Sequence, residues 1–88
     1  MQTGEQILVS DGVPVNGSSL QQIEFFTTMI HSKAARDAFA AKVKIPPQNR
    51  PAFEAQLLDL AKATIRQPKG TRKDYVIANL PALIKRNQ

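Results

Sequence analysis

Apolar residues recur at helical spacing along this 88-residue chain, and the stretch from residue 53 to residue 65 has the clearest pattern. Its apolar stripe consists of Phe53, Leu57, Leu60, Ala61 and Thr64, flanked by Leu58 and Ile65. A helix with such a stripe must bury it against another element. Because three further segments are amphipathic in the same way, we predict an all-α fold, a small four- or five-helix bundle.

Proline, glycine and small polar residues divide the chain into these helices. The predicted helix starts are Ser18 or Ser19, Ser32, Asn49 and Thr71. Ser19 and Gln22 match the S-x-x-Q capping box, in which each side chain satisfies a free backbone donor of the other residue. Pro46-Pro47 predicts that the second helix ends near residue 44, and the Pro/Gly segment 67–70 predicts the end of the third.

The last helical segment contains a proline. Val76 and Leu80 have helical spacing, and Pro81 interrupts the pattern. Either one helix kinks at Pro81, or Asn79 caps a new short helix with Pro81 in its first turn. We favour the second arrangement, because asparagine is a preferred N-cap and proline is well tolerated only near a helix start.

Residues 1–17 have a different pattern, so we divide the chain into an N-terminal arm and a helical domain at residues 18–88. Ile7-Leu8-Val9 and Val13-Pro14-Val15 are short β-prone runs separated by Ser10-Asp11-Gly12. The Asp-Gly pair is typical of tight hairpin turns, yet an isolated two-stranded hairpin is only marginally stable in water. A docked β-hairpin and a flexible tail therefore stand as alternatives for the arm.

The composition restricts where the protein works. The chain has no Cys, so neither a disulfide nor a Cys-based zinc site supplements its core, and a reducing compartment suits it. The N-terminus lacks the charged start and long apolar stretch of a secretory signal, and no apolar run approaches the roughly 20 residues that span a bilayer. We expect a soluble, cytoplasmic protein that does not enter a membrane.

No group of residues predicts catalysis, a metal site or a cofactor. The single histidine, His31, falls at the predicted end of the first helix, where it complements the helix dipole. The carboxylates are scattered, and Glu54 and Asp59 lie on different sides of one predicted helix. The glycines are dispersed, so no glycine-rich phosphate loop is present. We expect a protein that is not an enzyme and holds no metal or cofactor.

Positive charge is concentrated in the later part of the chain. All twelve Lys and Arg residues follow residue 32, and residues 1–31 carry three acidic residues. The candidate residues for binding an anion or a nucleic acid are Lys62, Arg66, Lys69, Arg72, Lys73, Lys85 and Arg86. Four of them surround one predicted interhelical loop, where Gly70 and Thr71 offer backbone amides to a phosphate. The same charge fits an acidic protein partner, or it serves solubility alone.

The opposite charge of the N-terminal arm suggests a role for it. The arm carries Glu5 and Asp11 and no basic residue. We hypothesise that it lies across the basic face of the helical domain and competes with the ligand of that face. The attraction is weak, because salt screens exposed ion pairs.

Apolar candidates for partner binding lie on the first predicted helix. Phe25, Phe26 and Met29 broaden its apolar face, and aromatic and methionine side chains are common interface anchors. Burial in the core is the alternative for each, and a broad face also permits a homodimer. We predict a regulatory protein-interaction module that binds a protein partner, an acidic one included, or itself. The alternative is a nucleic-acid-binding regulator that uses residues 62–73 and the C-terminus.

Three features resemble those of known helical proteins. The helix with Phe25-Phe26, the alanine-rich segment 33–39 and the Pro46-Pro47 break resemble leader-type helical modules of bacterial peptide natural products. They resemble small helical bundles in general equally well. No motif is specific to one family, so no residue role is assigned from the resemblance.

Overall fold

The computed structural model describes residues 2–88, and within that range all regular structure is helical. The elements are α1 (Gly4–Ser10), α2 (Ser19–His31), α3 (Lys33–Lys42), the short 3₁₀ helix η1 (Pro47–Asn49), α4 (Arg50–Ile65) and α5 (Arg72–Asn87). The predicted all-α class with up to five helices is confirmed. The β-hairpin suggested for the arm is wrong, since residues 2–88 contain no strand.

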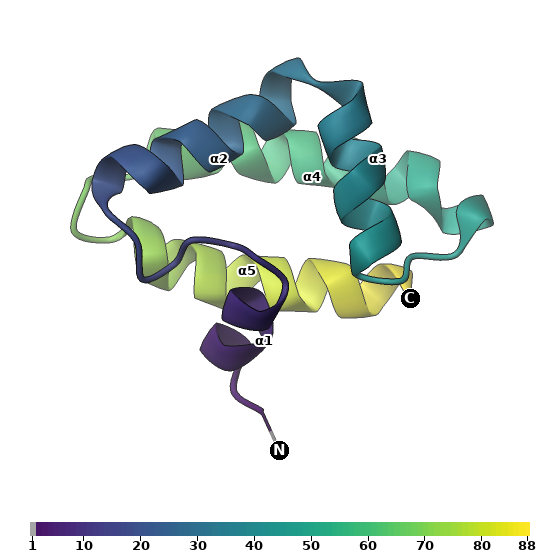
Figure 1. The fold of residues 1–88 in the computed structure, drawn as a ribbon, viewed down its shortest axis with the longest axis horizontal. Helices are drawn as coiled ribbons and strands as arrows, with labels where there is room; N and C mark the ends of the chain where they lie inside the picture. The colour runs from purple at the N-terminus through teal and green to yellow at the C-terminus, as the bar shows by residue number, and fades with distance from the viewer. Residues whose placement is uncertain (1) are drawn as a thin grey trace.

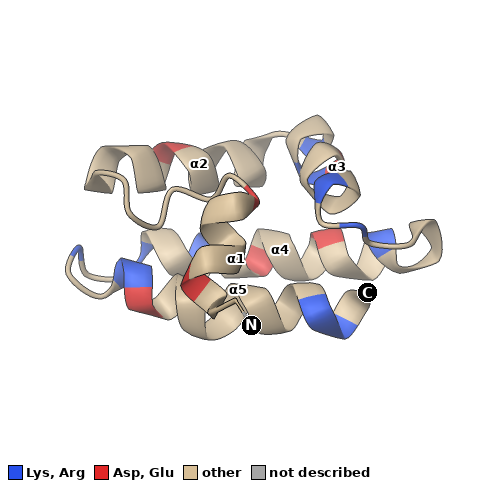
Figure 2. Cartoon of the chain, turned by 60° about the horizontal axis from the view of Figure 1, so that its bottom comes forward, with Lys and Arg blue, Asp and Glu red and all other residues tan. Residues whose placement is uncertain are grey.

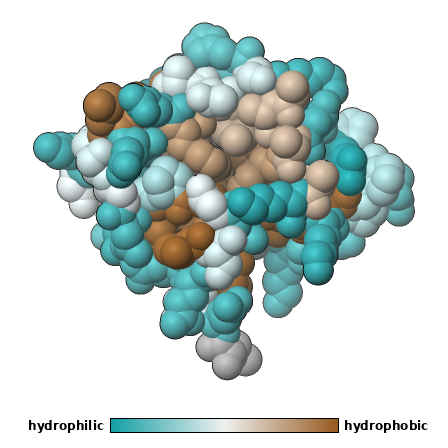
Figure 3. Space-filling view, viewed as in Figure 1, coloured by the Kyte–Doolittle hydropathy of each residue, from teal (hydrophilic) through white to brown (hydrophobic). Residues whose placement is uncertain are grey.

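Helix α4 is the centre of the arrangement. It packs against α2, α3 and α5, while α1 packs against α5 (Figure 1). The resulting molecule is flat, with principal extents of 35 × 33 × 16 Å. Side chains fill the space that separates the ribbons in Figure 1, and hydrophobic surface reaches solvent in the middle of that face (Figure 3).

The core forms where the predicted stripe of α4 meets its neighbours. Phe53 and Leu57 of α4 are fully buried together with Phe26 of α2 and Leu80 of α5. The ring of Phe53 stacks on that of Phe39, with 6.3 Å between the centroids. Burying such side chains contributes about 1.5–3 kcal/mol each, so this cluster fixes how the helices pack.

The segment expected to form a hairpin turn instead ends α1. Thr3 and Gln6 form a capping box at its start, and Gly12 has a φ of 83° at its end. The amide of Gly12 donates to the Val9 carbonyl and that of Val13 to the Leu8 carbonyl, which is a Schellman ending. The positive φ that favours Asp-Gly in hairpin turns equally suits this ending, so the dipeptide does not distinguish the two.

Helix α2 begins one residue earlier than its predicted capping box. Ser18 and Gln21, rather than Ser19 and Gln22, cap each other's backbone amides. The amide group of Gln22 is buried and donates to the Val15 carbonyl at 3.0 Å and the Gly17 carbonyl at 3.4 Å. Gln22 therefore ties the segment that follows α1 to α2.

The next two helices begin where the sequence predicts. The Ser32 hydroxyl accepts a hydrogen bond from the Ala35 amide, so Ser32 caps α3. Asn49 precedes α4 as expected, but its side chain makes no capping bond and donates instead to the Asn87 carbonyl at 2.9 Å. This contact joins the start of α4 to the end of α5.

Helix α5 passes through Pro81 without a break, so the predicted new helix at Asn79 is wrong. The Asn79 side chain donates to the Tyr75 carbonyl, one turn earlier, and caps nothing. Proline supplies no amide to the carbonyl of Ile77, four residues before it. Helix α1 crosses at this point: a Cβ at Gly4 would lie 3.4 Å from Pro81 and 3.6 Å from the Ile77 carbonyl. Packing of α1 and the core therefore holds one continuous helix.

Candidate interaction groove

Of the three apolar residues proposed as partner contacts, Phe26 and Met29 belong to the core and Phe25 packs against it. Phe26 is 1% exposed and Met29 is 6% exposed. Phe25 is partly buried, and its ring meets those of Phe26 and Phe39 edge-on, with centroid distances of 5.0 and 6.0 Å. In this fold all three side chains serve packing between α2, α3 and α4, the alternative role that the sequence left open.

Arg72, one of the candidate basic residues, is also buried. Its guanidinium donates to the carbonyls of Thr64 and Gln67 and, at 2.9 Å, to the Ser19 hydroxyl. The Thr64 carbonyl lies in the last turn of α4, where the helix dipole attracts a positive charge, and the Gln67 carbonyl lies in the turn that follows the helix. Arg72 therefore satisfies the end of α4 and is not presented to a ligand.

Lys73 is paired with the N-terminal arm. Its ammonium lies 2.8 Å from the Glu5 carboxylate and donates to the side-chain oxygen of Asn16 at 2.6 Å. The hydrogen bond and the positive charge of Lys73 lower the pKa of Glu5. The arm thus touches the basic surface at this residue, although it also contributes core residues.

The other candidate basic residues lie in two places. Lys62, Arg66 and Lys69 are exposed near the turn between α4 and α5. Lys85 and Arg86 are exposed at the far end of α5, about 20 Å away at 1.5 Å of rise per helical residue (Figure 2). The set therefore does not form one continuous surface.

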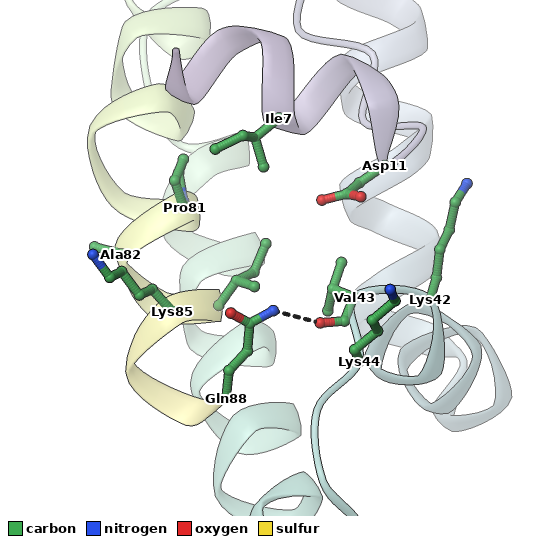
Figure 4. Close-up of a pocket in the computed structure, with 10 residues that line it drawn as sticks. Ile7, Asp11, Lys42, Val43, Lys44, Pro81, Ala82, Lys85 and Gln88 are labelled. Carbon is green, nitrogen blue, oxygen red and sulfur yellow. Dashed lines mark hydrogen bonds between the residues drawn. The ribbon is translucent and has the colours of Figure 1, made fainter. Parts of the chain in front are cut away.

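A groove of about 510 Å³ lies between α1, the C-terminal end of α3 and α5 (Figure 4). We call it the lysine groove; its lining residues are Ile7, Asp11, Lys42, Val43, Lys44, Pro81, Ala82, Ile84, Lys85 and Gln88. Five of these are apolar and three are lysines. Ile7 and Asp11 point into the groove from α1, and the side chain of Gln88 reaches across it to donate to the Val43 carbonyl at 2.8 Å.

Lys44 has an unusual backbone conformation at the edge of this groove. Its φ is 62°, in the left-handed region that glycine adopts most easily. The Lys44 amide donates to the Ala41 carbonyl and the Ile45 amide to the Ala40 carbonyl, so α3 has the same Schellman ending as α1. A side chain with a Cβ costs about 1 kcal/mol at this position. The fold holds a lysine where glycine would be less strained.

The charge of the lysine groove is mostly positive. Lys42, Lys44 and Lys85 form no ion pair with any residue of the range 2–88, whereas Asp11 contributes a single carboxylate. Apolar lining beside free ammonium groups suits a ligand that combines an apolar side chain with a negative charge. Lys42 and Lys44 are not among the basic residues singled out from the sequence; the signal for them was a valine between two lysines, one residue before the Pro46-Pro47 break.

A second cluster brings together two carboxyl groups that the sequence keeps apart. Asp37 of α3 and Glu54 of α4 both approach the Lys33 ammonium, at 3.1 and 3.9 Å. They border a cavity of about 430 Å³ that Arg36 and Arg50 also line. Burial, together with Asp37, raises the pKa of Glu54, and a hydrogen bond from Glu54 lowers the pKa of Asp37.

Comparison with known proteins adds no functional assignment. The chain matches no protein-family model, no curated protein and no solved structure. Among residues 2–88, no three His, Cys, Asp or Glu side chains gather as a metal site would require. None of the helices described is both long enough and apolar enough to cross a bilayer.

Proposed function

We propose that the protein is a non-enzymatic, regulatory interaction module that binds an acidic segment of a partner protein in the lysine groove. The observation that carries this proposal is the apolar floor bordered by three lysines without an ion pair among the described residues. We place this activity in the cytoplasm, because a chain without cysteine needs no disulfide and so suits a reducing compartment.

The chemistry of the groove favours one kind of ligand. Ile7, Pro81 and Ala82, the apolar lining residues that are not buried, offer a surface that an apolar side chain can cover, and such burial gives about 25 cal/mol per Å². Carboxylates on either side of that apolar side chain would then meet the ammonium groups of Lys42 and Lys44. The positive charges steer the encounter and select against basic segments.

The strained backbone of Lys44 supports the same proposal. Sparsely populated backbone conformations often persist where a side chain is needed for function. A lysine retained at φ 62° places a positive charge at the groove edge, which glycine would not. The groove therefore combines charge, apolar surface and local strain at one place.

Nucleic acid is the competing partner. Lys62, Arg66 and Lys69 remain exposed together near one turn and suit phosphate contacts. Burial of Arg72 and pairing of Lys73 with Glu5 leave this surface smaller than the sequence suggested. A second copy of the chain is a further candidate ligand for the groove.

The experiment is a selection from a random-peptide display library with the full chain as bait. The groove variant is Lys42→Ala with Lys85→Ala, and the matched control is Lys62→Ala with Lys69→Ala, which also removes two exposed charges. We expect selected peptides to combine Asp or Glu with a large apolar residue. The groove variant should weaken their binding about tenfold, and the control should change it less than twofold.

Two results would overturn the proposal. The first is a set of selected peptides that bind the groove variant and the control equally well. The second is a library that yields no peptide together with a strong gel shift of mixed DNA and RNA at about 50 mM salt. That shift would fall steeply by about 200 mM salt. It would be lost in the control variant, which lacks Lys62 and Lys69, and kept in the groove variant. That pattern would assign the protein to the nucleic-acid alternative.

A further inference from the structure

The carboxyl groups of Asp37 in α3 and Glu54 in α4, which we call the carboxyl pair, both lie beside the Lys33 ammonium. The Lys33 ammonium lies 3.1 Å from Asp37 Oδ2 and 3.9 Å from Glu54 Oε1, so one positive charge faces both groups. The two carboxyl groups differ in exposure, which is 46% for the Asp37 side chain and 12% for that of Glu54. Burial disfavours the ionised form, so the two groups are in unequal environments.

The cations around this pair come from both helices. Lys33 and Arg36 lie on α3 and Arg50 lies at the start of α4, and all three line the same cavity. The Arg36 guanidinium donates to the carbonyls of Met29 and Ile30, which end α2. Arg50 donates through Nε to the Ile45 carbonyl. Both arginines are therefore bound to backbone oxygens, and Lys33 is the cation that forms ion pairs with the two carboxyl groups.

The charges of Arg36 and Arg50 favour ionised Glu54 and Asp37 respectively without forming ion pairs with them, and the Lys33 side chain that does form ion pairs is 76% exposed. An exposed ammonium in water contributes little to holding an ion pair. Two ionised carboxylates that share it would repel each other. One proton shared between them removes that repulsion and adds a hydrogen bond to an ionised acceptor, which is a strong type of hydrogen bond.

We propose that Glu54, as the neutral acid, donates a hydrogen bond to the Asp37 carboxylate, and that this shared proton fastens α3 to α4 as a pH-sensitive clasp. When Glu54 ionises, its proton passes to solvent and the hydrogen bond is lost. The like charges then weaken the contact between the two helices beside Lys33, while the stack of Phe39 on Phe53 still joins them. The clasp lies outside the lysine groove, so this inference holds whatever ligand the groove takes.

The direction of the pH effect follows from the two pKa shifts. The pKa of Glu54 is raised above 4.5 by burial and by Asp37, so its stabilising effect is full below pH 4.5 and is lost as the pH rises through the higher value. The pKa of Asp37 is lowered below 3.8, first by the hydrogen bond from Glu54 and then by Lys33. Its contribution is present above pH 3.8 and is lost in stronger acid.

The first test follows the side-chain carboxyl carbons of the full chain by NMR between about pH 2 and pH 8. We expect Glu54 to titrate above 4.5 and Asp37 below 3.8, and Asp37→Asn to bring the Glu54 midpoint down. Asp59→Asn, an exposed carboxylate on the same helix, is the control and should leave the Glu54 midpoint unchanged. A Glu54 midpoint that is the same in the natural chain and in Asp37→Asn would overturn the shared proton.

The second test asks whether the proton holds the helices together. Amide hydrogen exchange, corrected for the intrinsic effect of pH, is compared between about pH 4 and pH 7 for α3 and for α5. We expect the protection of α3 to fall with rising pH in the natural chain, and to change much less in Glu54→Gln, which keeps a neutral donor at all pH values. Protection in α3 that falls equally in Glu54→Gln would remove the clasp.

Discussion

The guanidinium of Arg72 donates a hydrogen bond of 2.9 Å to the Ser19 hydroxyl and thereby joins the first turn of α5 to the first turn of α2. The same guanidinium donates to the Thr64 carbonyl in the last turn of α4 and to the Gln67 carbonyl in the turn that follows. Three helix ends therefore meet at one charged side chain that is 5% exposed. A residue that the sequence places in a basic surface instead has a structural role.

Replacing Arg72 by Ala should reduce the free energy of unfolding by about 2–4 kcal/mol, because it removes the hydrogen bonds of a buried guanidinium to the Thr64 and Gln67 carbonyls and to the Ser19 hydroxyl. Lys69→Ala, which removes an exposed charge from the adjoining turn, should change it by less than about 0.5 kcal/mol. Urea unfolding followed by circular dichroism measures both values. Equal midpoints for the two variants would contradict the structural role of Arg72.

Helix α1 offers a matched pair of neighbours. Leu8 is fully buried, whereas Val9 is 49% exposed. We expect Leu8→Ala to cost about 2–4 kcal/mol of unfolding free energy, and Val9→Ala less than about 0.5 kcal/mol. Thermal unfolding of the two variants checks this. An equally small loss of stability in Leu8→Ala and Val9→Ala would show that α1 is not packed into the core. It would then favour the hypothesis that the N-terminal arm competes with a ligand.

Lys44→Gly should stabilise the fold by about 0.5–1 kcal/mol, because glycine adopts a φ of 62° without the clash of a Cβ. The same substitution should weaken binding of the selected acidic peptides, since it removes an ammonium from the lysine groove. Unfolding and peptide-binding measurements on one sample separate the two effects. Loss of stability in Lys44→Gly would show that the lysine side chain itself supports the α3 ending.

The ion pair of Glu5 and Lys73 predicts a second pH effect. The Lys73 ammonium lowers the pKa of Glu5 below 4.5, so the stability that the pair adds is present above pH 4.5 and is lost in more acidic solution. We expect Lys73→Ala to return the Glu5 midpoint towards 4.5 in a carboxyl NMR titration. Added salt should have the same effect on the natural chain, because both side chains are partly exposed. A Glu5 midpoint insensitive to Lys73→Ala would exclude the pair in solution.

Capping residues in the sequence located most helix starts. The prediction failed where one sequence signal is compatible with two local structures. Ser32 caps α3 as predicted, because serine is a preferred N-cap when it directly precedes an amphipathic helical segment. Asp11-Gly12 suits both a hairpin turn and a helix ending, and the capping box at Thr3 favoured the helix. Pro81 lies inside α5 because tertiary packing outweighs the local cost of a missing hydrogen bond.

The candidate sites depended more on tertiary structure than the helices did. Sequence spacing cannot tell that Asp37 and Glu54, on different helices, face the same ammonium. It also cannot tell that α1 and α5 flank Lys44 and so create a groove. Such juxtapositions depend on how the helices cross, and many crossings are compatible with the same apolar stripes.

The sequence by itself determined an all-α chain, the approximate limits of four helices and a basic later part, because periodicity, capping and charge are local or additive properties. Only the tertiary structure decided which charged residues form buried structural contacts and which apolar faces are buried in the core. Arg72, which was assigned to a surface, illustrates the first, and Phe26, for which partner binding and burial were both open, illustrates the second, since both side chains are buried. The reason is physical: burial is a property of contacts between distant segments, and those contacts exist only once the helices have packed.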